Sequence, residues 1–196
     1  MSCRAGLFSK TSFCISFSAS FLGGSGQHLA TWTRDAKTEK RGLWLVRPAH
    51  QDGEGTPEYP PAETHGDKTC THAAEPVKCG HIIRLTNIET QRNLHSHSVK
   101  SPLSKQQEVS VYEGKDQGDD WKVECLESQD VWRRGESVRL EHVVTGKFLG
   151  ASSDAEFNER TCGRNCPLMN HLESFARDNR DSLADVQAEQ GIYLHR

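Results

Sequence analysis

The chain is short of the features that mark membrane proteins and nucleic-acid-binding proteins. None of its apolar stretches reaches the roughly 18 to 20 residues that a membrane-spanning helix needs. Its 24 Lys and Arg residues are outnumbered by 27 Asp and Glu residues, so no basic excess is available to hold a phosphate backbone. The sequence therefore predicts neither a membrane span nor a nucleic-acid partner.

Recognisable catalytic and metal-binding motifs are also scarce in the sequence. The chain has no Gly-x-Ser-x-Gly elbow and no paired carboxylates in an apolar segment, so we expect no enzyme. His95 and His97 supply two imidazoles, whereas a closed zinc site takes four ligands, and the sequence positions no third partner. We therefore expect no metal or other cofactor, and the competing interpretation is a turn in which these imidazoles cap backbone groups.

Long helical periods are missing, and short apolar runs alternate with Gly, Pro, Asn and Asp, which predicts a mostly β domain. The one helix candidate, Leu172–Val186, has no sustained apolar face and is interpreted as a polar excursion. Residues 48–75 are rich in Pro and nearly free of apolar side chains, which is typical of a linker. At the start, Arg4 and Lys10 precede a Ser-interrupted apolar stretch. Residues 1–21 are therefore a weak signal peptide or an unstructured start.

Seven cysteines favour an oxidising compartment, and their odd number leaves one thiol unpaired or shared. Cys162 and Cys166 are separated by three residues, whereas a redox motif has two between its cysteines. This pair is expected to form a local disulfide or to remain as two exposed thiols.

Internal repetition gives the strongest signal in the sequence. Gly80–Ser96 aligns with Gly135–Ala151, with Gly, Arg, Leu and Thr at matching positions, and Ser101–Glu108 aligns with Cys166–Glu173 through Pro, Leu and Glu. Part of a third copy lies before Trp44, at about the distance that separates Ser104 from Trp121 in repeat two. Three repeats of about four short strands each predict a β-trefoil. The predicted divisions are partial repeat one at 22–47, a linker at 48–75, repeat two at 76–131 and repeat three at 132–196.

Short motifs in repeat two resemble one family closely. They are Glu75-Pro-Val-Lys-Cys-Gly80, Ile83-Arg-Leu-Thr-Asn87, Asn93-Leu-His-Ser-His97, Ser101-Pro-Leu-Ser104, Gln107-Glu-Val-Ser110 and Asp119-Asp-Trp121. The chain is similar here to MIR-domain proteins of the stromal cell-derived factor 2-like family. The resemblance implies a non-catalytic quality-control protein of the endoplasmic reticulum lumen, which joins an Hsp70 and its J-domain co-chaperone and limits aggregation of unfolded clients. Because the end, Tyr193–Arg196, is unlike a retention signal, a secreted protein is the alternative location.

Two other functions fit the same repeats: a lectin-like, carbohydrate-binding trefoil, and an accessory MIR domain related to those of protein O-mannosyltransferases. The large aromatic residues Trp44, Trp121 and Trp132 recur near repeat ends, where they are expected to fill the barrel. Arg84 and Arg139 occupy equivalent strand positions and are expected on the surface or in hydrogen bonds between repeats. The expected partner or glycan surface consists of Arg84, Arg92, His95, His97 and Arg139.

Cys79 and Cys125 flank repeat two. In a trefoil unit the first and fourth strands pair antiparallel, so the start of one lies beside the end of the other. The two cysteines can then approach to the Cα separation of about 5.5 Å that a disulfide needs. We therefore predict a Cys79–Cys125 bridge, which leaves Cys70 free or paired with Cys3 or Cys14. The alternative bridge is Cys70–Cys79.

Overall fold

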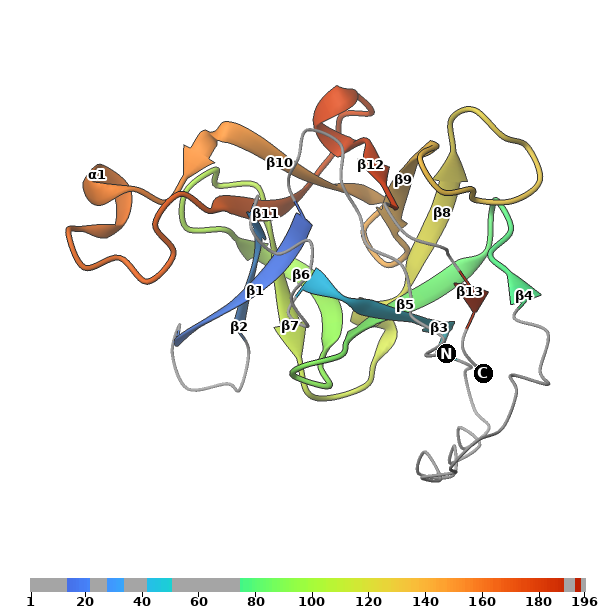
Figure 1. The fold of residues 1–196 in the computed structure, drawn as a ribbon, viewed down its shortest axis with the longest axis horizontal. Helices are drawn as coiled ribbons and strands as arrows, with labels where there is room; N and C mark the ends of the chain where they lie inside the picture. Colours follow the sequence, from blue (N-terminus) through green and yellow to red (C-terminus); the bar gives the residue numbers. More distant parts are fainter. Residues whose placement is uncertain (1–13, 22–27, 34–41, 51–74, 189–192, 195–196) are drawn as a thin grey trace.

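The structure, a computed structural model, describes residues 14–21, 28–33, 42–50, 75–188 and 193–194. Short strands dominate this part of the chain (Figure 1). The strands are β1 (Cys14–Phe21), β2 (His28–Thr33), β3 (Trp44–Pro48), β4 (Glu75–Pro76), β5 (Ile82–Asn87), β6 (Asn93–Lys100), β7 (Gln107–Tyr112), β8 (Trp121–Cys125), β9 (Ser137–His142), β10 (Lys147–Glu156), β11 (Leu172–Arg177), β12 (Val186–Gln187) and β13 (Tyr193–Leu194). The helical elements are α1 (Glu159–Cys162) and the 3-10 turns η3 (Gln117–Asp119) and η4 (Ser182–Ala184). In this part of the chain, no helix is long and apolar enough to cross a membrane.

Strand pairing reveals a threefold arrangement. Strands β2, β7 and β11 each pair antiparallel with the other two, around a common centre. Each of these strands also forms a hairpin with the strand before it, namely β1, β6 and β10. Three hairpins that meet in this way confirm the predicted β-trefoil of three repeats.

The remaining strands form the barrel that joins the repeats. The last strand of one repeat pairs with the first strand of the next, as in β3 with β5 and β8 with β9. Alternation sends Trp121 and Val123 of β8 into the core while Lys122 faces solvent. Trp44, Trp121 and Trp132 are all buried in one apolar cluster, which confirms their expected place in the barrel.

Repeat one is incomplete among the described residues, because no strand there corresponds to β5 or β9. In the structure β13 pairs parallel with β3, through Leu194 and Val46, and antiparallel with β4. This short strand lies along the free side of β3. Strand β1 falls within residues 1–21, which we had placed outside the domain, and it pairs with β2. Most of the expected linker, 51–74, lies outside the described residues.

The interpretation of 172–186 as a polar excursion was wrong. Residues 172–177 form β11, and its polar Glu173 and Ser174 are fully buried in contact with neighbouring strands. Buried polar side chains need hydrogen-bond partners, and here those partners come from another repeat. The local sequence pattern does not show them, so the strand could not be recognised from it.

Two disulfides are present among the described residues. Cys79 bonds to Cys125, the predicted pair, with a Cα separation of 5.5 Å. The Gly80 N–H donates to Val123 O at 2.7 Å, which holds the approach to β5 against the end of β8. Cys162 and Cys166 form the local bridge. The alternative prediction of a Cys70–Cys79 bridge is therefore wrong, because Cys79 is bonded to Cys125. Cys3 and Cys70 lie outside the described residues.

Candidate functional site

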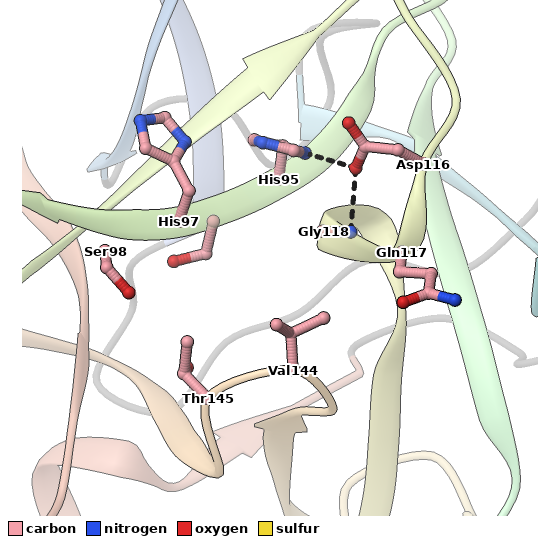
Figure 2. Close-up of a pocket in the computed structure, with 9 residues that line it drawn as sticks. His95, His97, Ser98, Asp116, Gln117, Gly118, Val144 and Thr145 are labelled. Atoms are coloured by element: carbon pink, nitrogen blue, oxygen red, sulfur yellow. Dashed lines mark hydrogen bonds and ion pairs between the residues drawn. The ribbon is translucent and has the colours of Figure 1, made fainter.

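A hollow of about 480 Å³ opens on repeat two beside the turn that joins β9 and β10 (Figure 2). Its walls come from β6, η3 and that turn. The lining residues are His95, Ser96, His97, Ser98, Asp116, Gln117, Gly118, Val144 and Thr145. The hollow brings together two of the five residues of the expected partner surface, His95 and His97, with others that the sequence analysis did not select.

The imidazoles reach the hollow because of the strand period. His95 and His97 are two residues apart on β6, so they project from the same face of the strand, and their ring centroids are 5.3 Å apart. His95 is buried and also contacts the ring of Tyr112. His97 is half-buried. The alternative expectation, that both imidazoles cap backbone groups in a turn, does not fit a pair placed within a strand.

The facing wall is built by a capped 3-10 turn. Asp116 precedes η3, and its Oδ1 accepts a hydrogen bond from the Gly118 N–H at 2.7 Å. At the end of the turn, Asp119 is fully buried, and its Oδ1 lies 3.0 Å from His95 Nδ1. Its second oxygen accepts from Asn93 Nδ2 at 3.0 Å. The carboxylate of Asp119 therefore links strand β6 to the turn.

A third histidine, His142, joins the two sides of the hollow. His142 is fully buried at the end of β9, and its Nε2 lies 3.1 Å from Gly118 O. Because a carbonyl oxygen can only accept, Nε2 carries the proton and Nδ1 accepts from the Thr145 hydroxyl at 2.8 Å. Burial lowers the pKa of His142 below its ordinary value of 6.5, and the nearby His95 and His97 act in the same direction. This imidazole is therefore neutral at neutral pH.

This lowered pKa predicts a loss of stability in mild acid. In the unfolded chain His142 takes up a proton near pH 6.5, whereas the folded protein resists protonation until a lower pH. The free energy of unfolding should therefore fall as pH drops through 6.5 toward the lower folded-state pKa, and His142→Gln should make that fall shallower. Urea unfolding at several pH values measures the difference. Parallel curves for the two proteins would contradict the assignment.

Asp120, next to the hollow, changes the free energy of unfolding with pH in the opposite direction. Its pKa is raised from 3.8 mainly by burial, although the His50 N–H donates to its Oδ1 at 2.9 Å and lowers it in part. A raised carboxyl pKa makes the folded state lose stability as pH rises from 3.8 through the folded-state pKa. Protonation of Asp120 therefore favours the folded state, whereas protonation of His142 disfavours it.

The three arginines of the expected surface do not line the hollow. Arg84 is buried, and its Nε donates to Pro48 O at 2.8 Å, across the junction of repeats one and two. Arg139 is paired with Asp185 at 2.9 Å and with Glu124 at 3.6 Å. Arg84 therefore fits the expectation of hydrogen bonding between repeats. Arg139 lies on the outer side of β9, between the buried Val138 and Leu140, and its pairing with Glu124 also joins two repeats. Arg92 lies near the end of the β6–β7 hairpin, 3.5 Å from Glu113.

Among the lining residues that the sequence analysis did not select, Val144 carries a signal of its own in the sequence. Val144 lies in the β9–β10 turn with 58% of its surface exposed, and its neighbour Val143 is 44% exposed. Turns are ordinarily built from polar residues and Gly, so two adjacent aliphatic side chains in one turn are an available signal. An exposed apolar side chain at the rim of a hollow, as Val144 is here, suits contact with another chain.

Comparison with known sequences gives a consistent result. Residues 25–131 match the MIR domain family. The chain is 32% identical to a stromal cell-derived factor 2-like protein of Dictyostelium discoideum, over 88% of this chain and 70% of the relative. It is 33% identical to stromal cell-derived factor 2-like protein 1 of Mus musculus, over 87% of this chain and 66% of the relative. The chain thus spans about two thirds of the length of these relatives.

Solved structures show the same fold. The crystal structure of the SDF2-like protein from Arabidopsis thaliana superposes with a TM-score of 0.72 at 25% identity, covering 97% of this chain and 94% of that one. Part of a Saccharomyces cerevisiae protein O-mannosyltransferase complex, bound to its sugar donor, superposes with a TM-score of 0.66 at 21% identity. This second match covers 25% of that chain, so it extends the likeness of fold to a domain of a larger protein.

Proposed function

The chain belongs to the MIR-domain family of stromal cell-derived factor 2-like proteins, and from this premise we propose that it is a non-enzymatic quality-control factor of the secretory pathway. In this proposal it acts in the endoplasmic reticulum lumen, where it binds an Hsp70 with its J-domain co-chaperone and limits the aggregation of unfolded clients. The observation that carries the proposal is the family membership over most of the chain. The two disulfides suit an oxidising compartment.

The hollow is the surface that we assign to partner binding. Its rim carries the exposed Val144, and its walls carry hydrogen-bonding groups from His97, Gln117 and Thr145. An apolar anchor surrounded by polar groups is the usual composition of a protein-protein contact. Of the five residues expected at this surface, the proposal keeps His95 and His97. It leaves out Arg84 and Arg139, whose guanidinium groups serve the repeat junctions, and Arg92, which does not line the hollow.

The two rival functions make different predictions. A carbohydrate-binding trefoil would bind glycans on its own and would need no Hsp70. An accessory domain like that of the O-mannosyltransferases would show neither chaperone binding nor suppression of aggregation by itself. The likeness to the mannosyltransferase complex rests on the fold alone, so the chaperone function has the stronger support.

A single substitution at the rim tests the proposed surface. Glu89 holds the position in the β5–β6 turn that Val144 holds in the β9–β10 turn, by the alignment of the two repeats. Val144→Glu should therefore leave the fold intact, because the equivalent turn accepts this residue. We expect it to weaken binding to a purified lumenal Hsp70 and J-domain pair at least about tenfold, as loss of an apolar anchor does. Suppression of client light scattering should fall in parallel.

A matched control separates a local effect from a general loss of apolar surface. Leu126 is also exposed, at 37%, but it follows β8 at the end remote from η3. Leu126→Glu should bind as the unmodified protein does. Equal weakening by both variants would contradict the hollow as the contact surface. A protein that forms no complex and leaves client scattering unchanged would contradict the function itself, and glycan binding in its place would favour the carbohydrate rival.

A further inference from the structure

Three potential metal ligands converge at the edge of the hollow. One ligand atom each from His95, Asp116 and Asp119 lies within 4.8 Å of the other two. His95 Nδ1 is 3.0 Å from the Asp119 oxygen and 3.5 Å from the Asp116 oxygen. Ligands held about 2.0 to 2.1 Å from a tetrahedral ion are about 3.3 Å apart, so these separations match those around a bound cation. Figure 2 shows His95 and Asp116 pointing toward each other.

Hydrogen bonds behind the cluster orient both carboxylates. Asp119 Oδ2 accepts from Asn93 Nδ2 at 3.0 Å and from the Asp116 N–H at 3.3 Å, which leaves Oδ1 directed at His95. The Gly118 N–H fixes Asp116 Oδ1 from the other side at 2.7 Å. Metal-binding carboxylates are commonly held by such outer hydrogen bonds, which keep their free lone pairs directed at the ion.

Repeat three shows that the fold does not need this cluster. The turn η4 is capped by Asp181 as η3 is by Asp116. At the positions of His95 and Asp119, however, repeat three carries Gly150 and Ala184. The backbone at Gly150 packs directly against η4, since a Cβ there would lie 2.8 Å from the carbonyl oxygen of Leu183. The same strand and turn therefore form without a histidine or a second carboxylate.

We propose that His95, Asp116 and Asp119 bind one divalent transition-metal ion, Zn²⁺ in the first instance, with its remaining coordination position open to the hollow. One imidazole and two carboxylates form a nitrogen and oxygen donor set that suits Zn²⁺ and its neighbours in the first transition row. The sequence analysis found no third ligand for the histidines because Asp116 and Asp119 are supplied by a different element. This inference is independent of chaperone binding.

Isothermal titration of the full chain with Zn²⁺, after treatment with a chelator, tests the site. We expect one ion per chain, and Asp116→Asn should weaken its affinity at least about tenfold. Asp181→Asn is the matched control, because Asn caps a turn as well as Asp does and both variants alter the same capping position. It should leave the affinity unchanged. Equal affinities for the two variants, or no binding by the unmodified chain, would overturn the proposal.

A second pair of measurements identifies the ligands. The double variant His95→Ala with Asp119→Ala gives repeat two small side chains like those of repeat three, so it should fold yet lose the ion. Its circular dichroism spectrum checks the fold. Because the chain has seven cysteines, Co²⁺ serves as the optical probe. We expect the bound Co²⁺ to absorb light without a thiolate charge-transfer band. A thiolate band, or undiminished binding by the double variant, would show that the ion binds elsewhere.

Discussion

Replacement of Cys79 and Cys125 by Ser is expected to lower the free energy of unfolding by about 4 kcal/mol. The bridge closes a loop whose ends are 46 residues apart in sequence, and a cross-link of that span removes much of the conformational entropy of the unfolded chain. A loss of this size is a large share of the stability of an ordinary domain. Urea unfolding of the oxidised protein and of the double variant, followed by tryptophan fluorescence, measures the difference.

The second disulfide provides the control. Cys162 and Cys166 are four residues apart, so the same entropy relation gives about 2 kcal/mol for replacing both by Ser. That bridge lies around α1, in a largely exposed excursion between β10 and β11. An equal or greater loss for Cys162 and Cys166 than for Cys79 and Cys125 would contradict the view that the longer bridge holds the barrel strands together.

The fold could be predicted largely because repetition carries information that a single segment lacks. The alignment of Gly80–Ser96 with Gly135–Ala151 identified equivalent strands, and those strands are β5, β6, β9 and β10. It also located Cys79 and Cys125 at the two ends of one unit, which led to the bridge. Trp44 and Trp121 could be assigned to the barrel for the same reason, since each recurs near the end of a repeat.

Features that depend on contact between repeats could not be predicted in this way. Arg84 was expected to face outward or to bond between repeats, and only the structure shows that the Pro48 carbonyl accepts its hydrogen bond. Strand β11 was missed because the segment 172–186 as a whole has no sustained apolar face, although every residue from Leu172 to Ala176 is buried. The ligands Asp116 and Asp119 were not joined to His95, because the sequence does not show that η3 packs on β6.

Glu173 accounts for the second large effect that we expect. Its side chain is fully buried in repeat three, yet it accepts hydrogen bonds from the Ser101 hydroxyl at 3.0 Å and from the N–H groups of Leu103 and Ser104 at 2.8 and 2.7 Å. Glu173→Ala removes the acceptor for a turn of repeat two and leaves the part-buried N–H groups of Leu103 and Ser104 without it. The free energy of unfolding should fall by about 3 to 5 kcal/mol, as when a buried charged acceptor is removed. Chemical denaturation measures the loss.

Hydrogen exchange shows where that loss occurs. The amides of Leu103 and Ser104 should exchange faster in Glu173→Ala, because their acceptor is gone, while amides of the β8–β9 pair should keep their order of protection. Glu108 occupies the equivalent position in repeat two and is only half-buried, so Glu108→Ala should cost less than about 1 kcal/mol. Similar losses for the two variants, or unchanged exchange at Leu103 and Ser104, would show that the buried carboxylate does not hold the turn. The larger loss at Glu173 is expected because its hydrogen bonds join two repeats, each of which relies on its neighbours to complete the trefoil.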